Sequence, residues 1–293
     1  MNQRKRSILV CVLSDLRSNS LDRYVVNSVS FANQIDADIH FLTPVDIQKA
    51  LDAILSRPSR GAFQTIKTVS HPVAGDWPAG TVHDAVKRHS CDLIVVPSGS
   101  INEEIGRGAE IRKDLLEQST APVLILSPTV DLAKTPIKSI FVPMSGEIRL
   151  SSALTLGLKL ASQINVPVDL LHVDEKGSQT ESPLETTGDQ PHHEYRQLLD
   201  KILAEACPFS DTKERACVRT LYNVQGTRSV EIVRAAKDDP SRAFVLEWHG
   251  SLIQGRAETL KSILHQIIVP IFLVRTEPDQ LSVLKIGPEN RVA

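Results

Sequence analysis

At 293 residues the chain is about twice as long as the commonest protein domain, which favours two domains. Hydrophobic residues make up 41% of the chain and charged residues 23%, a balance that excludes a disordered protein. The formal net charge of −2 gives no global field for nucleic acid or an anionic membrane surface. No apolar stretch approaches the ~20 residues that span a bilayer.

The cysteines argue against an oxidising compartment. Cys11, Cys91, Cys207 and Cys217 form no C-x-x-C pair and lack the density of a disulfide framework. Cys11 lies within an apolar run, so we expect a buried thiol. The only apolar run near the N-terminus, Ile8–Leu13, is too short for a signal peptide and is typical of a strand. We therefore expect a cytoplasmic protein with no membrane insertion and no nucleic-acid partner.

The first part of the chain alternates short apolar runs with helical patterns. The expected strands are 7–13, 39–43, 63–70, 93–97 and 122–127. The expected helices have apolar stripes within 21–32, 47–55, 75–89 and 111–119. This order predicts a β-α-β-α-β-α-β-α-β unit.

The second part repeats the same unit. Its expected strands are 139–144, 168–172, 217–222, 244–247 and 270–275, and its helices are 150–161, 195–206, 226–237 and 260–267. Gly75 and Gly226 are separated by the same number of residues as Gly99 and Gly250, as a duplication requires. The extra length of the second copy falls at about 175–191, a polar segment expected to be a flexible insertion.

This pattern predicts the α/β class: two tandem, doubly wound, mainly parallel five-stranded sheet domains. We expect the first domain at residues 1–130, the second at 131–276 and a C-terminal tail at 277–293. Ligands in such sheets bind at the carboxyl ends of the strands, near the point where the strand order reverses.

Several segments resemble the universal stress protein family. Cys91–Gly99 followed by Ala121–Leu126 is similar to the end of such a domain, and Val269–Val274 repeats that ending. Ser139–Ala161 is similar to the family's first strand and helix. The resemblance covers nearly the whole chain and implies a tandem member with an adenine nucleotide alpha hydrolase-like fold and a stress-response or regulatory role.

The resemblance also implies where ATP would bind. Members that bind ATP have an Asp at the end of the first strand and a G-x2-G-x9-G-(S/T) loop after the fourth. Here Leu13 and Met144 stand at the Asp position, no G-x2-G occurs, and Ala109-Glu110 and Ala257-Glu258 replace Gly-Ser. A carboxylate there would repel a triphosphate, so we expect degenerate nucleotide sites in both domains and no required cofactor.

One loop keeps the glycine spacing of a phosphate site. Gly250 and Gly255 can expose backbone amides, and Arg256 supplies a cation before an expected helix. The alternative is a glycine-rich turn with a solvated arginine. The candidate residues for a nucleotide or anion are Val173, Gly226, His249, Gly250, Ser251, Gly255 and Arg256, with Gly75, Gly99, Ser100, Gly106 and Gly108 as first-domain equivalents.

The sequence predicts no metal site and no catalytic residues. His192-His193-Glu194 fits a surface helix start better than a zinc motif, because no P-C-x-x-C follows. No G-x-S-x-G elbow is present. We expect a non-catalytic protein, with two alternatives left open: an adenine-nucleotide switch or weak ATPase that uses ATP or AMP in the second domain, and a small apolar-ligand module.

The expected partners begin with the chain itself. Strands Val123–Leu126 and Ile271–Val274 are expected to pair within the chain and so to cover two exposed sheet edges. A homodimer built from this unit and an unknown protein partner are further expectations.

Overall fold

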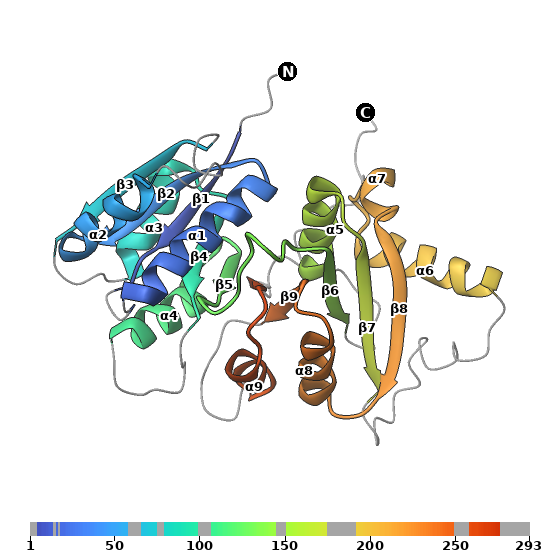
Figure 1. Ribbon diagram of the computed structural model, residues 1–293. Coiled ribbons are helices and arrows are strands. Elements are labelled where there is room, and N and C mark those ends of the chain that lie inside the picture. The colour runs from blue at the N-terminus through green and yellow to red at the C-terminus, as the bar shows by residue number, and fades with distance from the viewer. Residues whose placement is uncertain are drawn as a thin grey trace, which may run out of the picture.

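The computed structural model describes residues 5–13, 16, 18–57, 66–74, 79–98, 107–144, 151–174, 192–248 and 258–275. Strands and helices alternate through two successive halves (Figure 1). The first half contains β1 (Arg6–Cys11), α1 (Ser18–Gln34), β2 (Ala37–Pro44), α2 (Val45–Leu55), β3 (Thr68–Val73), α3 (Ala79–His89), β4 (Leu93–Pro97), α4 (Arg107–Gln118) and β5 (Val123–Leu126). The second half contains β6 (Ser139–Met144), α5 (Ser152–Ile164), β7 (Val168–Asp174), α6 (His192–Ala206), α7 (Thr212–Arg215), β8 (Val218–Gln225), α8 (Arg228–Asp238), β9 (Arg242–Trp248), α9 (Glu258–Gln266) and β10 (Ile271–Arg275).

All the strands form one ten-stranded sheet in the order β3-β2-β1-β4-β5-β10-β9-β6-β7-β8. Within each half every pair is parallel, which confirms the predicted α/β class. Counted outward from the centre of the sheet, equivalent strands of the two halves follow in the same order. The two expected five-stranded sheets are therefore joined edge to edge.

The junction is an antiparallel pair of β5 with β10, which meet in the middle of the molecule (Figure 1). Phe272 on β10 pairs with Leu124 on β5, and its ring lies 5.6 Å from the ring of Phe31 on α1. Arg275, the last residue of β10, donates a hydrogen bond to the backbone oxygen of Glu117 on α4 at 2.6 Å. This pairing confirms the expectation that the two strands pair within the chain.

Two layers of helices cover the sheet, because the strands are apolar on both faces. Leu9 and Cys11 pack with one face while Ile8 and Val10 pack with the other. The face that contains Ile8 is covered by α1, α2, α5 and α6. The opposite face is covered by α3, α4, α8 and α9. The predicted burial of the Cys11 thiol is confirmed, and this burial raises its pKa far above the ordinary value.

Two side-chain amides on α1 hold the segment that joins the halves. Asn27 donates to the oxygen of Val130 at 2.6 Å and accepts from the amide of Leu132 at 3.0 Å. Gln34 donates to the oxygen of Ile137 at 2.7 Å and accepts from its amide at 3.3 Å. The predicted domain boundary at residue 130 lies within this segment.

Some element boundaries differ from the sequence expectations. The sequence places Gly108 in a loop before a helix at Ile111, but α4 begins at Arg107, because its polar first turn carries no apolar periodicity. Residues 63–65 of the expected strand 63–70 lie outside the described residues, and β3 extends beyond its expected end to Val73, because it pairs with β2 up to Pro44. The short helix α7 is absent from the expectations, although Asp211 and Glu214 form a capping box at its start.

No helix in the described part of the chain combines the length and the apolar character needed to cross a membrane.

Candidate functional site

Each half has one place where the strand order reverses. β1 lies between β2 and β4, and β6 lies between β7 and β9. The crevice at the carboxyl ends of these strands is the general ligand site of doubly wound sheets. The candidate residues Gly75, Gly99, Ser100, Gly106, His249, Gly250, Ser251, Gly255 and Arg256 lie outside the described residues.

In the second half a carboxylate lies at the start of α5. The hydroxyl of Ser151 donates to Oε2 of Glu247 at 3.1 Å and accepts from the backbone amide of Leu154 at 3.1 Å. Ser151 is thus the N-cap of α5, and Glu247 is the next-to-last residue of β9. The partial positive charge of this helix end faces a carboxylate that belongs to the protein. An anion entering the crevice here would meet a negative charge.

The two positions where the family resemblance predicts an acid are apolar and buried. Leu13, just beyond β1, is 1% exposed, and Met144, the last residue of β6, is 7% exposed. Both side chains belong to the hydrophobic clusters that pack against the sheet. Leu13 has no hydrogen-bonding atom, and the thioether sulfur of Met144 is only a weak acceptor.

Gly226 and Val173, the described candidates of the second half, have structural roles. The amide of Gly226 donates to the oxygen of Asp174 at 3.0 Å. A Cβ at Gly226 would lie 2.7 Å from Oε1 of Glu231, so the glycine permits the close approach of this buried carboxylate. Glu231 pairs with Arg234 at 2.8 Å. Val173 is buried in the core against the sheet.

In the first half a buried tyrosine joins the strands that border the crevice. The hydroxyl of Tyr24, on α1, lies 3.1 Å from the backbone oxygen of Cys11 on β1 and 3.0 Å from that of Val95 on β4. Burial raises the pKa of this phenol well above its usual value, so the hydroxyl remains a donor. The buried Arg112 on α4 is close enough to oppose this shift. Neither residue was among the sequence candidates, because their burial depends on the packing of α1 and α4.

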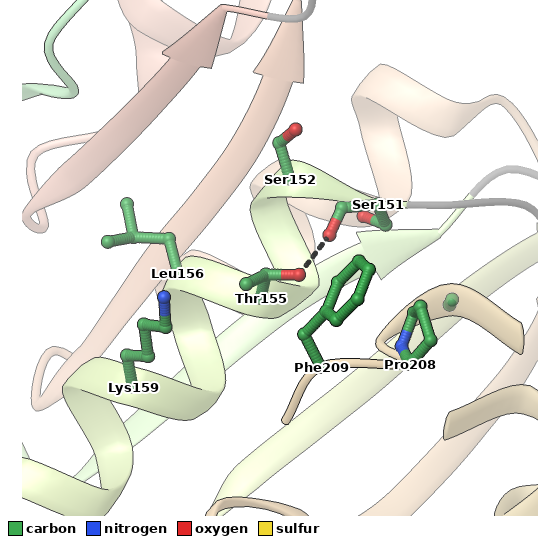
Figure 2. Close-up of a pocket in the computed structure, with 8 residues that line it drawn as sticks. Ser151, Ser152, Thr155, Leu156, Lys159, Pro208 and Phe209 are labelled. Carbon is green, nitrogen blue, oxygen red and sulfur yellow. Dashed lines mark hydrogen bonds between the residues drawn. The ribbon is translucent and has the colours of Figure 1, made fainter. Parts of the chain in front are cut away.

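A pocket of about 240 Å³ opens between α5 and the segment after α6 (Figure 2). It is lined by Ser151, Ser152, Thr155, Leu156, Lys159, Ala206, Pro208 and Phe209. Thr155 donates to the backbone oxygen of Ser151 at 2.9 Å, and the Phe209 ring is 78% exposed beside it. None of these residues was among the sequence candidates, and the signal in the sequence was the aromatic Phe209 in the polar segment after α6.

The comparisons with known proteins concern the fold. No protein-family model and no curated protein matches the chain. A functionally unknown protein, PA1789, from Pseudomonas aeruginosa PAO1 has a TM-score of 0.60 and 15% identity, over 96% of this chain and 95% of that one. A putative universal stress protein from Pseudomonas aeruginosa UCBPP-PA14 has a TM-score of 0.59 and 16% identity, over 96% of each chain. A universal stress protein from Archaeoglobus fulgidus DSM 4304 has a TM-score of 0.59 and 17% identity, over 92% of this chain and 98% of that one. The chain therefore has the fold of universal stress protein structures over nearly its whole length.

Proposed function

We propose that the chain is a non-catalytic, tandem universal stress protein with a regulatory role in the stress response, and that it works without a family-type ATP site. Its fold is similar to solved universal stress proteins over both halves. A duplicated α/β scaffold of this kind can act by binding a partner protein at its surface, without turning over a substrate. The expected homodimer and protein partner belong to this proposal.

The observation that carries the proposal is the pairing of Ser151 with Glu247 at the crevice of the second half. The start of α5 is the place where backbone amides and the helix dipole would otherwise favour a phosphate. Glu247 places a carboxylate there, while Met144 removes the acid that would hold the nucleoside. Both changes oppose ATP binding, and each acts on a different part of the ligand.

A simpler anion is a different case. The loop with Gly250, Gly255 and Arg256 retains donors for phosphate or sulfate in its sequence. A charged hydrogen bond contributes about 1.5–3 kcal/mol, so the loss of several nucleotide contacts weakens ATP binding by orders of magnitude. We therefore propose that the second half binds at most a small anion and binds ATP only weakly.

Calorimetry of the full chain tests this proposal with three titrants: ATP with Mg²⁺, AMP and inorganic phosphate. The variant Arg256→Ala serves as the control for the loop. We expect no micromolar binding of either nucleotide, and any phosphate binding should be lost in Arg256→Ala. Micromolar ATP binding that disappears in Arg256→Ala would overturn the proposal in favour of a nucleotide switch. ATP hydrolysis that follows the same variant would favour the weak ATPase.

A further inference from the structure

Three histidines from separate parts of the first half meet beside the outer edge of the sheet. His40 lies on β2, His71 on β3 and His89 at the end of α3. One ring nitrogen from each lies within 4.8 Å of the corresponding nitrogens of the other two. Nδ1 of His40 and Nε2 of His71 are 3.0 Å apart. The ring centroids are separated by 5.3 Å, 4.7 Å and 4.1 Å.

The fold explains why these side chains meet. His40 pairs with Val69, and Leu42 pairs with His71, so the two histidines are two residues out of register on neighbouring parallel strands. His40 and Leu42 are two residues apart on one strand and therefore point to the same face of the sheet, as does His71, which pairs with Leu42. Leu42 packs on that face with Val82 of α3, and His89 lies two turns further along the same helix. Strand register and helix length together bring the three rings to one point.

The proton state of the rings suits metal binding. The 3.0 Å contact between His40 and His71 needs one ring nitrogen with a proton and one without, so one of the two nitrogens carries a lone pair that accepts this hydrogen bond. Burial, followed by the charge of His89, lowers the pKa of both His40 and His71. When a cation binds, the shared proton moves through solvent to the outer nitrogen of the same ring. Both inward nitrogens then present lone pairs.

We propose that His40, His71 and His89 form a binding site for a late first-row divalent metal ion such as Zn²⁺, Co²⁺ or Ni²⁺. Imidazole nitrogen is the ligand type that these ions prefer. A tetrahedral ion with bonds of about 2.0–2.1 Å places its ligand nitrogens about 3.3 Å apart. The nitrogens of His40 and His71 are 3.0 Å apart, and one nitrogen of each ring lies within 4.8 Å of the others. The three rings are stacked, so these half-buried side chains must rotate about their χ angles to direct their lone pairs at one ion. A fourth position remains for water.

Such an ion would connect an edge strand to the helix layer. β3 is the outermost strand of its half, and its side chains are mostly half-exposed. His71 lies on β3, whereas His89 lies on α3, a helix that covers one face of the sheet. A shared metal ion would therefore stabilise the native position of β3, because it binds the folded chain and not the unfolded one. This role does not depend on the proposed function of the crevice.

Titration of the metal-free full chain with Co²⁺, followed by its visible absorption, and competition with Zn²⁺ test the site. We expect one equivalent to bind per chain with a histidine-ligated spectrum, and we expect Zn²⁺ to raise the temperature of unfolding. Each of the variants H40Q, H71Q and H89Q should weaken binding by at least about tenfold, since even indirect partners of a metal ligand contribute that much. Circular dichroism of the metal-free variants checks that they fold. H71Q changes a residue on the edge strand β3, so most of the contacts around this position are kept.

Two controls separate this site from surface binding. His265 is an exposed histidine on α9, and His192 and His193 are adjacent in the second half. H265Q and the double variant H192Q/H193Q should bind Co²⁺ as the wild-type chain does. The proposal is overturned if the wild-type chain fails to bind Co²⁺ and Zn²⁺. It is equally overturned if binding survives in H40Q, H71Q and H89Q, or is lost in H192Q/H193Q.

Discussion

The hydroxyl of Ser151 lies 3.1 Å from a carboxylate oxygen of Glu247 and joins the start of α5 to the end of β9. These two elements border the place where the strand order of the second half reverses. The same hydroxyl accepts from the amide of Leu154, so Ser151 caps the helix and also holds a carboxylate at its positive end. The geometry makes Glu247 the residue whose removal should alter anion binding most directly.

We predict that Glu247→Gln binds inorganic phosphate more tightly than the wild-type chain. Gln keeps an oxygen that can accept from Ser151, so the cap is retained while the charge is lost. Removing one like charge a few ångströms from an anion is worth about 1 kcal/mol or more, which is about fivefold in affinity. Calorimetry with phosphate measures the change.

The matched control is Glu205→Gln, which removes a carboxylate from the exposed surface of α6. Phosphate binding by this variant should equal that of the wild-type chain. Equal affinities of Glu247→Gln and Glu205→Gln would show that Glu247 does not oppose anions at the crevice.

The junction between the halves depends on Phe272. This side chain is 1% exposed and contacts Phe31 of the other half, so Phe272→Ala creates a cavity at the junction. We expect the free energy of unfolding to fall by about 3–5 kcal/mol, measured by denaturant titration. Phe209→Ala removes an equal ring from a 78% exposed position and should change stability by less than about 0.5 kcal/mol. Similar losses in both variants would contradict the tight packing of the junction.

An ion pair between the buried Asp169 and the exposed side chain of Arg219 joins β7 to β8. Asp169 is 0% exposed, and its carboxylate accepts from Nε of Arg219 at 3.0 Å and from Nη2 at 2.5 Å. Arg219→Ala leaves this carboxylate without its cation and should lower the free energy of unfolding by about 3 kcal/mol. The double variant Asp169→Ala/Arg219→Ala removes the orphaned charge and should recover part of that loss.

The control for the ion pair is Lys134→Ala, which breaks the exposed pair with Asp131 and should cost less than about 1 kcal/mol. If Arg219→Ala lowers the free energy of unfolding by no more than Lys134→Ala does, the burial of Asp169 does not strengthen its ion pair with Arg219. Urea titration of each variant gives these values.

Acid should destabilise the metal-free chain through the histidine cluster. The pKa values of His40 and His71 are lowered by burial and then by His89, with a further lowering from Lys67 for His40 and from Arg88 for His71, while Asp38 opposes the shift at His40. The unfolded chain therefore takes up these protons first as the pH falls, and stability decreases below about pH 6.5. The double variant H40Q/H71Q should lose less thermal stability than the wild-type chain between about pH 7.5 and 5.5. An identical loss in both proteins would show that the cluster does not titrate in this way.

The sequence predicts the strands that are apolar on both faces. β4 and β6 begin and end at the expected residues, because a continuous apolar run bounded by polar residues has few other places to lie in an α/β fold. The helix α7 was missed because its four residues are too short for any periodicity, although the spacing of Asp211 and Glu214 carried the signal. Polar helix starts, as at Arg107, have no apolar pattern to place them.

The functional residues were harder to predict than the fold. Gly226 has the loop position expected of a phosphate contact, yet its lack of a side chain is explained by Glu231 packing against it. His40, His71 and His89 are far apart in the sequence and match no ligand spacing. Their meeting depends on the register of β2 with β3 and on the last turn of α3, and both are set by tertiary packing.

Native mass spectrometry of the chain as purified tests most directly whether the fold works without a family-type ATP site. We expect the mass of the polypeptide with no ATP, ADP or AMP, and no nucleotide adduct after incubation with ATP and Mg²⁺ at micromolar concentration. A species heavier by one adenine nucleotide, which loses that mass on denaturation, would contradict the account.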